Sequence, residues 1–317
     1  MNILITGITG LFGSYLAKVF SEIGQIHGLI REGSSKRLLE NADFPIHWRE
    51  GDVLDPESLS VALIDIDLVI HAAGKVSFDP KDKNTLYAVN VQGTANLVNT
   101  MLADGVKRLI YISSVAAIGR SPELKSVDEK HKWTESPLNT DYSISKYWGE
   151  LEAWRGEQEG LDLMVVNPSI LLAKTSDDRS STMIYEYLKE GRTYYPKGTV
   201  NFIDIRDAAI LVRRLYEKEQ WGERFILNRE SMAYKEFYEL MGQVFGMKAP
   251  NKPLADSLLA WVLRAQWLFS KLRLTKTILN KQTALIAQQQ IFFDNQKVNR
   301  LLEFNYRSLE ETFEWAK

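Results

Sequence analysis

Cysteine is absent from the 317 residues, so the chain can form no disulfide, no thiolate metal site and no cysteine nucleophile. There are 4 histidines and no two have the spacing of a helical metal motif, so we expect no metal. No apolar run reaches the roughly 20 residues that a membrane span requires. The formal net charge of −2 argues against a nucleic-acid partner, because a general nucleic-acid binder needs a strongly basic face.

The N-terminal residues do not resemble a secretory signal. The apolar run Ile3–Ile5 follows no basic segment and stops at Thr6-Gly7. Together with the lack of cysteine, this leads us to expect a cytoplasmic protein.

Short aliphatic runs alternate with helical patterns over the first half of the chain. The predicted strands are apolar at nearly every position, as strands buried on both faces should be. They are Asn2–Thr6, Ile26–Arg31, Leu68–His71, Arg108–Ser113 and Leu163–Asn167. The predicted helices between or after them are Leu11–Ile23, Asn84–Asp104 and Tyr142–Glu159. This alternation predicts an α/β fold with a Rossmann-like, doubly wound parallel sheet.

The alternation of short apolar runs with helical patterns ends after Pro168. Residues 169–181 are polar and indicate a loop, and most of 234–317 has helical spacing. We therefore expect a first domain over 1–168 and a smaller, mainly helical C-terminal substrate lobe over 169–317. Segment 200–228 contains a strand, a helix and a further strand, and we expect it to rejoin the first domain.

The first predicted strand leads into a turn with three glycines, Gly7, Gly10 and Gly13, and then a helix. Glycine permits the tight turn and lets a pyrophosphate approach the bare backbone, while the helix N-terminus offers unpaired N–H groups. The pattern therefore favours a dinucleotide site. The alternative is an ordinary strand-to-helix turn.

The end of the second strand bears on which dinucleotide is bound. An NAD site usually places a carboxylate there, but this chain has Arg31, followed by Ser34 and Lys36. A guanidinium can fork onto a 2′-phosphate, so the sequence favours NADP. Glu32 would suit NAD if it pointed inward, and a solvated basic loop is the other interpretation.

Tyr142 and Lys146 lie at i and i+4 in a predicted helix, on one face. A nearby ammonium favours the phenolate form of tyrosine and makes it a better acid–base group near neutral pH. The same spacing occurs at Tyr185 and Lys189, which we interpret as an ordinary helix of the second lobe. A serine at the end of the strand Arg108–Ser113, either Ser113 or Ser114, could hold a substrate oxygen near Tyr142 with its hydroxyl. The alternative for that serine is a polar strand end.

These motifs together resemble the extended short-chain dehydrogenases/reductases of the NAD-dependent epimerase/dehydratase family, in the dihydroflavonol-reductase-like branch. The matching segments occur in the family's order, and they are Thr6–Gly13, Gly51–Val53, His71–Gly74, Asn90–Thr94, Ser113–Ser114, Tyr142–Lys146, Asn167–Ser169 and Asp204–Ala209. Val76–Phe78 and Arg31 resemble that branch in particular. The resemblance is strong up to about residue 228.

The resemblance implies a role for each matching residue. Tyr142 would be the catalytic acid/base and Lys146 its activator; Ser114 would orient the substrate oxygen, and Asn90 would support a proton path through water. The cofactor-binding residues would be Gly7, Thr9, Gly10, Leu11, Phe12, Gly13, Arg31, Ser34, Lys36, Asp52, Val53, Ala72, Ala73, Gly74, Tyr142, Lys146, Pro168, Ser169 and Ile170. The substrate-contacting residues would be Val76, Ser77 and Ser114.

We therefore expect an NADP(H)-dependent oxidoreductase acting on a carbonyl or alcohol of a medium-sized, largely apolar small-molecule substrate. The alternative is a sugar-nucleotide epimerase or dehydratase that holds NAD tightly. Against that alternative, no Gly-Pro follows the strand that ends at Asn167-Pro168. A non-enzymatic NADP-sensing protein is a third class, which the Tyr142/Lys146 pair disfavours.

Two surfaces suggest partners. By analogy with the family, the helices over 84–104 and 142–159 would form a homodimer. Residues 254–274 are apolar almost all round the helical wheel, with cations such as Arg264 and Lys271. They predict a lobe helix that covers the active site or an oligomer face. The alternative is peripheral contact with a membrane surface.

Overall fold

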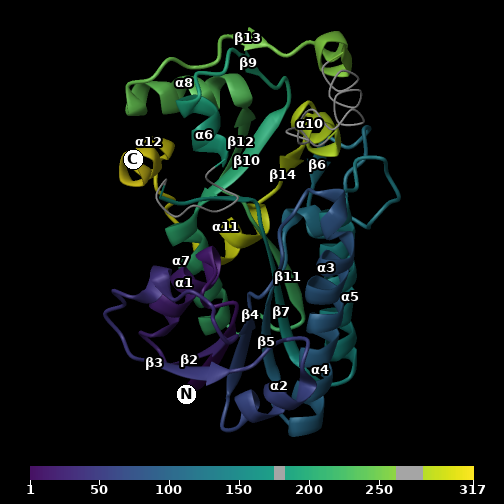
Figure 1. Ribbon diagram of the computed structural model, residues 1–317, viewed down its shortest axis with the longest axis vertical. Coiled ribbons are helices and arrows are strands. Elements are labelled where there is room, and N and C mark those ends of the chain that lie inside the picture. The colour runs from purple at the N-terminus through teal and green to yellow at the C-terminus, as the bar shows by residue number, and fades with distance from the viewer. Residues whose placement is uncertain (175–182, 262–280) are drawn as a thin grey trace.

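The computed structural model describes residues 1–174, 183–261 and 281–317, which form a larger α/β unit with a smaller unit at one end (Figure 1). A parallel sheet of seven strands runs through the larger unit in the order β11-β7-β5-β4-β1-β2-β3. Its strands are β1 (Asn2–Thr6), β2 (Gln25–Ile30), β3 (Ile46–Glu50), β4 (Leu68–His71), β5 (Arg108–Ile112), β7 (Asp162–Pro168) and β11 (Glu223–Leu227). The predicted Rossmann-like parallel sheet is confirmed. Strand order reverses between β1 and β4, where such sheets bind their ligands.

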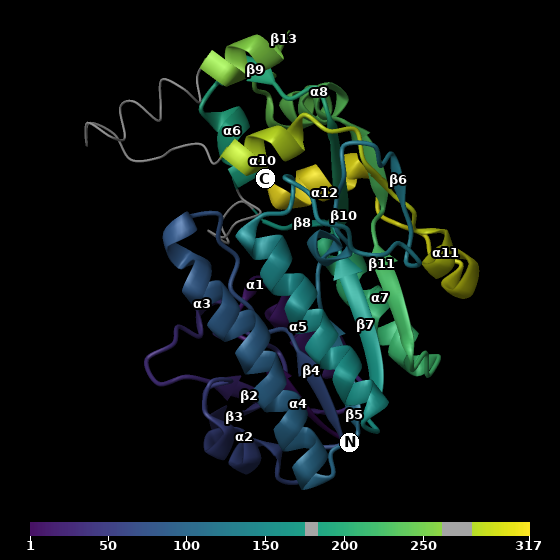
Figure 2. The same ribbon diagram turned by 90° about the vertical axis from the view of Figure 1, so that its right-hand side faces the viewer.

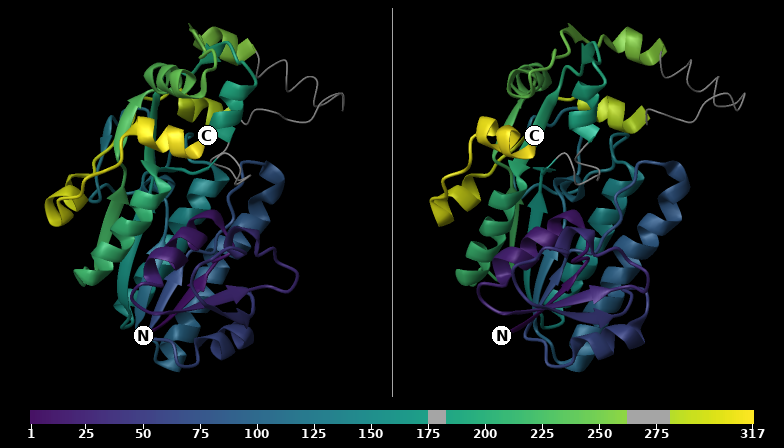
Figure 3. Two further views of the ribbon diagram at one scale, coloured as in Figure 1. Left: turned by 90° about the vertical axis from the view of Figure 1, so that its left-hand side faces the viewer. Right: turned by 60° about the vertical axis from the view of Figure 1, so that its left-hand side comes forward.

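Successive side chains of each strand enter cores on opposite faces of the sheet. Ile3 and Ile5 of β1 lie in one hydrophobic cluster, whereas Leu4 lies in the other. The first face is covered by α1 (Leu11–Phe20), α7 (Ile205–Glu217) and α11 (Gln296–Leu302) (Figure 3). The second is covered by α2 (Pro56–Leu63), α4 (Gly93–Asp104) and α5 (Asp141–Gln158) (Figure 2).

The predicted helix Asn84–Asp104 is interrupted in the structure. It consists of α3 (Lys83–Tyr87), a π-helical turn at Ala88–Gln92, and α4. Such a turn widens the backbone by one residue and often occurs beside a functional group. Here it contains Asn90, one of the predicted site residues.

The smaller unit has its own core around a three-stranded sheet ordered β12-β10-β8. Its strands are β8 (Ile170–Leu172), β10 (Thr199–Asp204) and β12 (Glu230–Ala233), and its main helices are α6 (Met183–Lys189), α8 (Tyr234–Phe245) and α12 (Leu309–Ala316). Short strand pairs join β9 (Tyr194–Tyr195) to β13 (Lys252–Pro253) and β6 (Ser126–Val127) to β14 (Phe292–Phe293), and α10 is Lys281–Ala287. Tyr185 is fully buried in the aromatic core of this unit, against Phe245 and Phe313.

The two units alternate along the chain. Within residues 200–228, β10 belongs to the smaller sheet, whereas α7 packs on α1 and β11 extends the larger sheet beside β7. Later still, Val298 of α11 enters the core of the larger unit. The larger unit is therefore completed by β11, α7 and α11, all of which follow β8 and β10 of the smaller unit in the chain.

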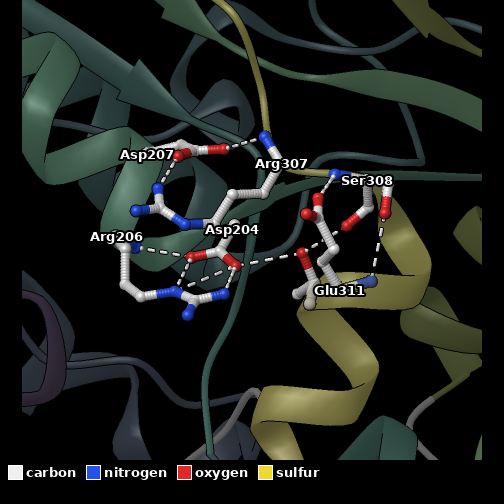
Figure 4. A network of polar contacts seen from close by, with 7 residues as sticks. Asp204, Arg206, Asp207, Arg307, Ser308 and Glu311 are labelled. Atoms are coloured by element: carbon white, nitrogen blue, oxygen red, sulfur yellow. Dashed lines mark hydrogen bonds and ion pairs between the residues drawn. The ribbon is translucent and has the colours of Figure 1, made fainter.

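A buried polar network fastens α12 to the start of α7 (Figure 4). Asp204 caps α7, pairs with Arg206, and accepts a hydrogen bond of 3.0 Å from the Thr312 hydroxyl of α12. Asp207 is fully buried and pairs with Arg307 just before α12. Burial raises the pKa of the Asp207 carboxyl, although Arg307 opposes that rise. The charged pairs thus keep two buried carboxylates satisfied where the units meet.

None of the helices within the three described ranges is both long and apolar enough to cross a lipid bilayer. Most of the apolar segment 254–274 lies outside the described residues, as does part of the polar segment 169–181. The predicted lobe-covering role and membrane contact of 254–274 therefore stay predictions.

Candidate active site

The turn after β1 has the conformation that its glycines allow. Gly7 has a φ of 69°, and the Gly10 amide donates to the Gly7 carbonyl at 2.9 Å. Gly10 then caps α1 without any side-chain hydrogen bond to the first helical amides. These amides and the positive end of the helix form a site suited to a phosphate group.

Close backbone packing explains two of the three glycines. A Cβ on Gly13 would overlap the Gly7 carbonyl oxygen, and a Cβ on Gly7 would overlap the Ala73 backbone of the neighbouring loop. The turn after β1 and the loop after β4 therefore approach each other with no room for side chains. A dinucleotide fits such a cradle, because its pyrophosphate needs bare backbone on which to sit.

An open cavity of about 710 Å³ lies at the ends of β2 and β3. Arg31, Glu32 and Ser34 after β2 form one side of it, and Asp52 after β3 is on the other. The Arg31 side chain is 67% exposed, and its guanidinium lies 4.0 Å from the Asp52 carboxylate. Arg31 and Asp52 thus both lie where the adenosine ribose of a dinucleotide would be expected to bind.

Lys36 lies away from the predicted phosphate contact. Its ammonium is 4.4 Å from the centre of the Trp48 ring, in a cation–π geometry. Of the predicted basic side chains Arg31 and Lys36, only Arg31 lines the cavity.

The remaining predicted cofactor residues lie at strand ends or in the segments that directly follow them. Thr9, Leu11 and Phe12 belong to the glycine turn and α1; Ala72, Ala73 and Gly74 follow β4. Val53 is buried against Gly93, and its carbonyl accepts a hydrogen bond from Asn96. Pro168 ends β7, Ser169 bonds to the Leu227 carbonyl, and Ile170 is 37% exposed. These segments follow the carboxyl ends of β1, β3, β4 and β7, the edge at which parallel sheets bind their ligands.

Tyr142 lies in the first turn of α5 and faces Ser114, just after β5. The Ser114 hydroxyl forms a hydrogen bond with the Tyr142 phenol. Burial raises the pKa of Tyr142, while the bond to Ser114 and the positive charge of Arg120 lower it. Phe78 packs against the Tyr142 ring edge-on, with centroids 5.8 Å apart. At neutral pH the phenol therefore carries its proton and is placed to donate it.

Arg120 is a site residue that the sequence patterns do not indicate. It follows the 3₁₀ helix Val115–Ile118 and Gly119, whose φ is 91°, and its charge acts on both Tyr142 and Tyr234. Within the described ranges, no carboxylate lies within ion-pair distance of the Arg120 side chain. The sequence shows only a single arginine six positions after Ser114, in a loop with no periodic pattern, and that is too little to indicate a site residue.

Lys146 lies one helical turn after Tyr142 and is buried. Its ammonium donates to the Ile112 carbonyl at 2.9 Å and lies 3.5 Å from the Tyr111 hydroxyl. Burial lowers the pKa of Lys146 to about 8, and Glu150 opposes that fall. The cation that lowers the pKa of Tyr142 in this structure is Arg120, and Lys146 bonds to the end of β5.

Asn90, in the π-helical turn, is held by protein groups. Its amide hydrogens go to the Lys75 carbonyl at 3.0 Å and the Ser145 hydroxyl at 2.9 Å. Its side-chain oxygen accepts from the Lys75 amide at 2.7 Å. Asn90 thus fixes the loop after β4 against α5, with no amide hydrogen left for the predicted water path.

The predicted substrate residues Val76 and Ser77 follow that loop. Val76 is 48% exposed, and the Ser77 hydroxyl accepts a hydrogen bond from the Asp79 amide. With Phe78 they form a partly exposed apolar edge beside Tyr142. No group of three or more metal-ligating side chains occurs in the described part of the chain.

Comparison with known proteins gives a consistent set of matches. Residues 3–227 match the family model described as the NAD dependent epimerase/dehydratase family. The "Putative dihydroflavonol 4-reductase" of Synechocystis sp. is 32% identical over 268 residues, covering 81% of this chain and 77% of that protein. Cinnamoyl-CoA reductase 1 of Petunia hybrida is 27% identical over 259 residues, which cover 77% of each chain.

Solved structures match over both units. The crystal structure of gox2253 superposes with a TM-score of 0.84 at 28% identity, covering 99% of this chain and 96% of that chain. The UDP-glucuronic acid 4-epimerase of Bacillus cereus in complex with NAD has a TM-score of 0.75 at 18% identity, with the same coverage of 99% and 96%. At 18% identity the second likeness shows the fold alone.

Proposed function

Because this chain belongs to the NAD-dependent epimerase/dehydratase family, as an extended short-chain dehydrogenase/reductase, we propose that it is an NADP(H)-dependent reductase of a carbonyl substrate. The observation that carries this proposal is the partly buried Tyr142 phenol with its hydrogen bond to Ser114, in a fold that also has the bare glycine cradle after β1. The proposed substrate is of medium size and largely apolar, because the apolar Phe78 packs beside Tyr142 and Phe78 and Val76 are both exposed.

A bound nicotinamide dinucleotide would supply or accept the hydride. The amides that begin α1 and the backbone of Gly7 and Gly13 would hold its pyrophosphate. Ser114 would orient the substrate oxygen by a hydrogen bond, and Tyr142 would donate its proton to that oxygen as negative charge develops. In the reducing direction the phenol must start protonated, and burial, which raises the pKa of Tyr142, keeps the proton on it at neutral pH. The positive charges of Arg120 and Lys146 would stabilise the phenolate that remains.

Steady-state oxidation of NADPH tests the proposal, with a dihydroflavonol and cinnamoyl-CoA as the first carbonyl substrates, since related proteins carry these names. A sugar-nucleotide epimerase would instead release NAD on denaturation and bind UDP-sugars. That result, without carbonyl reduction, would replace the proposal by the second candidate.

We expect Arg31→Ala to weaken NADPH binding by about tenfold or more and to change NADH binding little, because one charge-assisted bond to phosphate is lost. Fluorescence titration of each reduced cofactor measures the two dissociation constants. Lys36→Ala is the matched control, and it should cost less because the Lys36 ammonium lies on Trp48. Equal NADPH and NADH affinities in the native protein would contradict the NADP preference.

We also propose that the protein is a homodimer. Ile144, Trp148 and Leu151 form an exposed stripe on α5, with Trp148 51% exposed, and Tyr87 of α3 is 52% exposed. Apolar side chains at this helical spacing suit a second copy of the same face.

Trp148→Glu is expected to convert the dimer to a monomer, because it places a charge in an apolar interface. Light scattering after gel filtration measures the mass. Trp261→Glu is the control, since Trp261 is also exposed (67%) but lies in the smaller unit. Dissociation by the Trp261 variant alone would move the interface to the 254–274 segment.

A further inference from the structure

Glu150 is a buried carboxylate that the proposed reaction leaves unexplained. It lies on α5, one helical turn after Lys146 and two turns after Tyr142, and it is 1% exposed. A carboxylate at such a depth is costly unless several donors satisfy it.

Donors from three strands of the large sheet meet at this one side chain. The Ser113 hydroxyl after β5 donates at 2.6 Å, the Asn167 amide of β7 at 2.8 Å, and the Arg224 guanidinium of β11 lies 2.5 Å away. Trp154 donates at 3.3 Å from the next turn of α5. These donors satisfy the ionised form, so the site is built to keep a negative charge there.

One of these donors, Asn167, also contacts the strand end beside Tyr142, the proposed acid. Asn167 also donates to the Ser114 carbonyl at 2.9 Å, using the same amide nitrogen that bonds to Glu150. Glu150 therefore restrains the backbone of the serine that bonds to Tyr142.

Among the residues that the structure describes, no other negative charge acts on Lys146. Tyr111 of β5 faces it with a hydroxyl and a ring, the ring centre 4.8 Å from the ammonium, and burial raises the pKa of that phenol. His71 of β4 is buried and neutral, since burial and Lys146 lower its pKa to about 3. On α5 itself, Tyr142 is protonated at neutral pH and Glu150 is the carboxylate.

We propose that Glu150 is a positioning residue that keeps the Lys146 ammonium charged in its buried site and holds the Ser114 strand end against α5. Its catalytic significance rests on the proposed reductase function, whereas its electrostatic link to Lys146 does not. In this arrangement the charge of Glu150 favours the proton on Lys146, and the ion pair with Arg224 partly offsets that charge.

A titration of Lys146 itself tests the inference. Protein labelled with ¹³C at lysine Cε is titrated by NMR, and the Lys146 signal is assigned by its loss in Lys146→Arg. We expect a midpoint about 8 in the native protein. In Glu150→Gln the midpoint should fall by roughly one pH unit, because a negative charge that favours the ammonium is removed. Since a lower pKa loses the proton earlier, the alkaline limb of kcat/KM should move to lower pH by the same amount.

Arg224→Gln is the matched control, because it breaks the same ion pair from the other side. Its Lys146 midpoint should stay the same or rise, since a positive charge is lost. Glu150→Asp keeps the charge and should return the midpoint toward the native value; melting temperatures confirm that each variant is folded. An unchanged midpoint in Glu150→Gln, or an equal fall in the Gln variants of Glu150 and Arg224, would overturn the inference. A shifted midpoint in a protein that reduces no carbonyl would sustain the link and refute the proposed function.

Discussion

Replacing Tyr142 by phenylalanine is expected to lower kcat by about a thousandfold, because a positioned general acid contributes on the order of 10²–10⁴. The ring would keep its edge contact with Phe78, so the fold and the cofactor cradle should remain. Only the proton that burial retains on the phenol would be missing. NADPH oxidation at saturating substrate measures kcat, and fluorescence titration should show nearly native cofactor binding.

The chain supplies a matched control for this result in Tyr185→Phe. Tyr185 has the same four-residue spacing to a lysine, but it is buried in the aromatic core of the smaller unit. Its variant should turn over at the native rate. Native activity in Tyr142→Phe would remove Tyr142 from the reaction.

The second large effect is expected from Gly13→Ala. The added methyl group would overlap the Gly7 carbonyl oxygen, so either α1 or the turn must move. Overpacking of this kind costs about 1–3 kcal/mol of folding free energy, and it would also displace the amides that are proposed to hold the pyrophosphate. Urea unfolding should show the loss of stability, and titration should show that binding of both NADPH and NADH is lost.

Gly33→Ala separates this effect from backbone strain. Gly33 has a φ of 71° at the other end of the proposed cofactor site, but a Cβ there meets nothing within 4 Å. Its cost should be limited to about 1–2 kcal/mol for the left-handed conformation, with dinucleotide binding retained. Tight cofactor binding by Gly13→Ala would contradict the proposal that the glycine turn holds the pyrophosphate.

Much of the larger unit could be predicted from the sequence because its signals are local. The glycine turn, Tyr142 and Lys146 each combine residue type with short spacing, and the strands that precede them are continuous apolar runs. β3 (Ile46–Glu50) is not among the predicted strands, because apolar and polar side chains alternate along this edge of the sheet, whereas the predicted strands are continuous apolar runs. An edge strand keeps one side open, so it needs no apolar run.

Contacts between distant segments explain what the sequence could not predict. One such contact is that of the Lys36 ammonium with the Trp48 ring, 4.4 Å from its centre; the role of Lys36 at a phosphate stays a prediction. Arg120 and Glu150 have no motif of their own and gain their roles from Tyr142, Tyr234 and Arg224. Such pairings depend on strand order and helix packing, which spacing along the chain does not report.

The network of Figure 4 has a consequence for how the protein is made. Asp207 leaves the ribosome 100 residues before Arg307, and Asp204 precedes Thr312 by 108. Until those partners emerge, the two acids must stay hydrated or take up protons. Contacts of such long sequence separation form late in folding. The junction between the two units can therefore close only after the chain has been synthesised as far as Thr312.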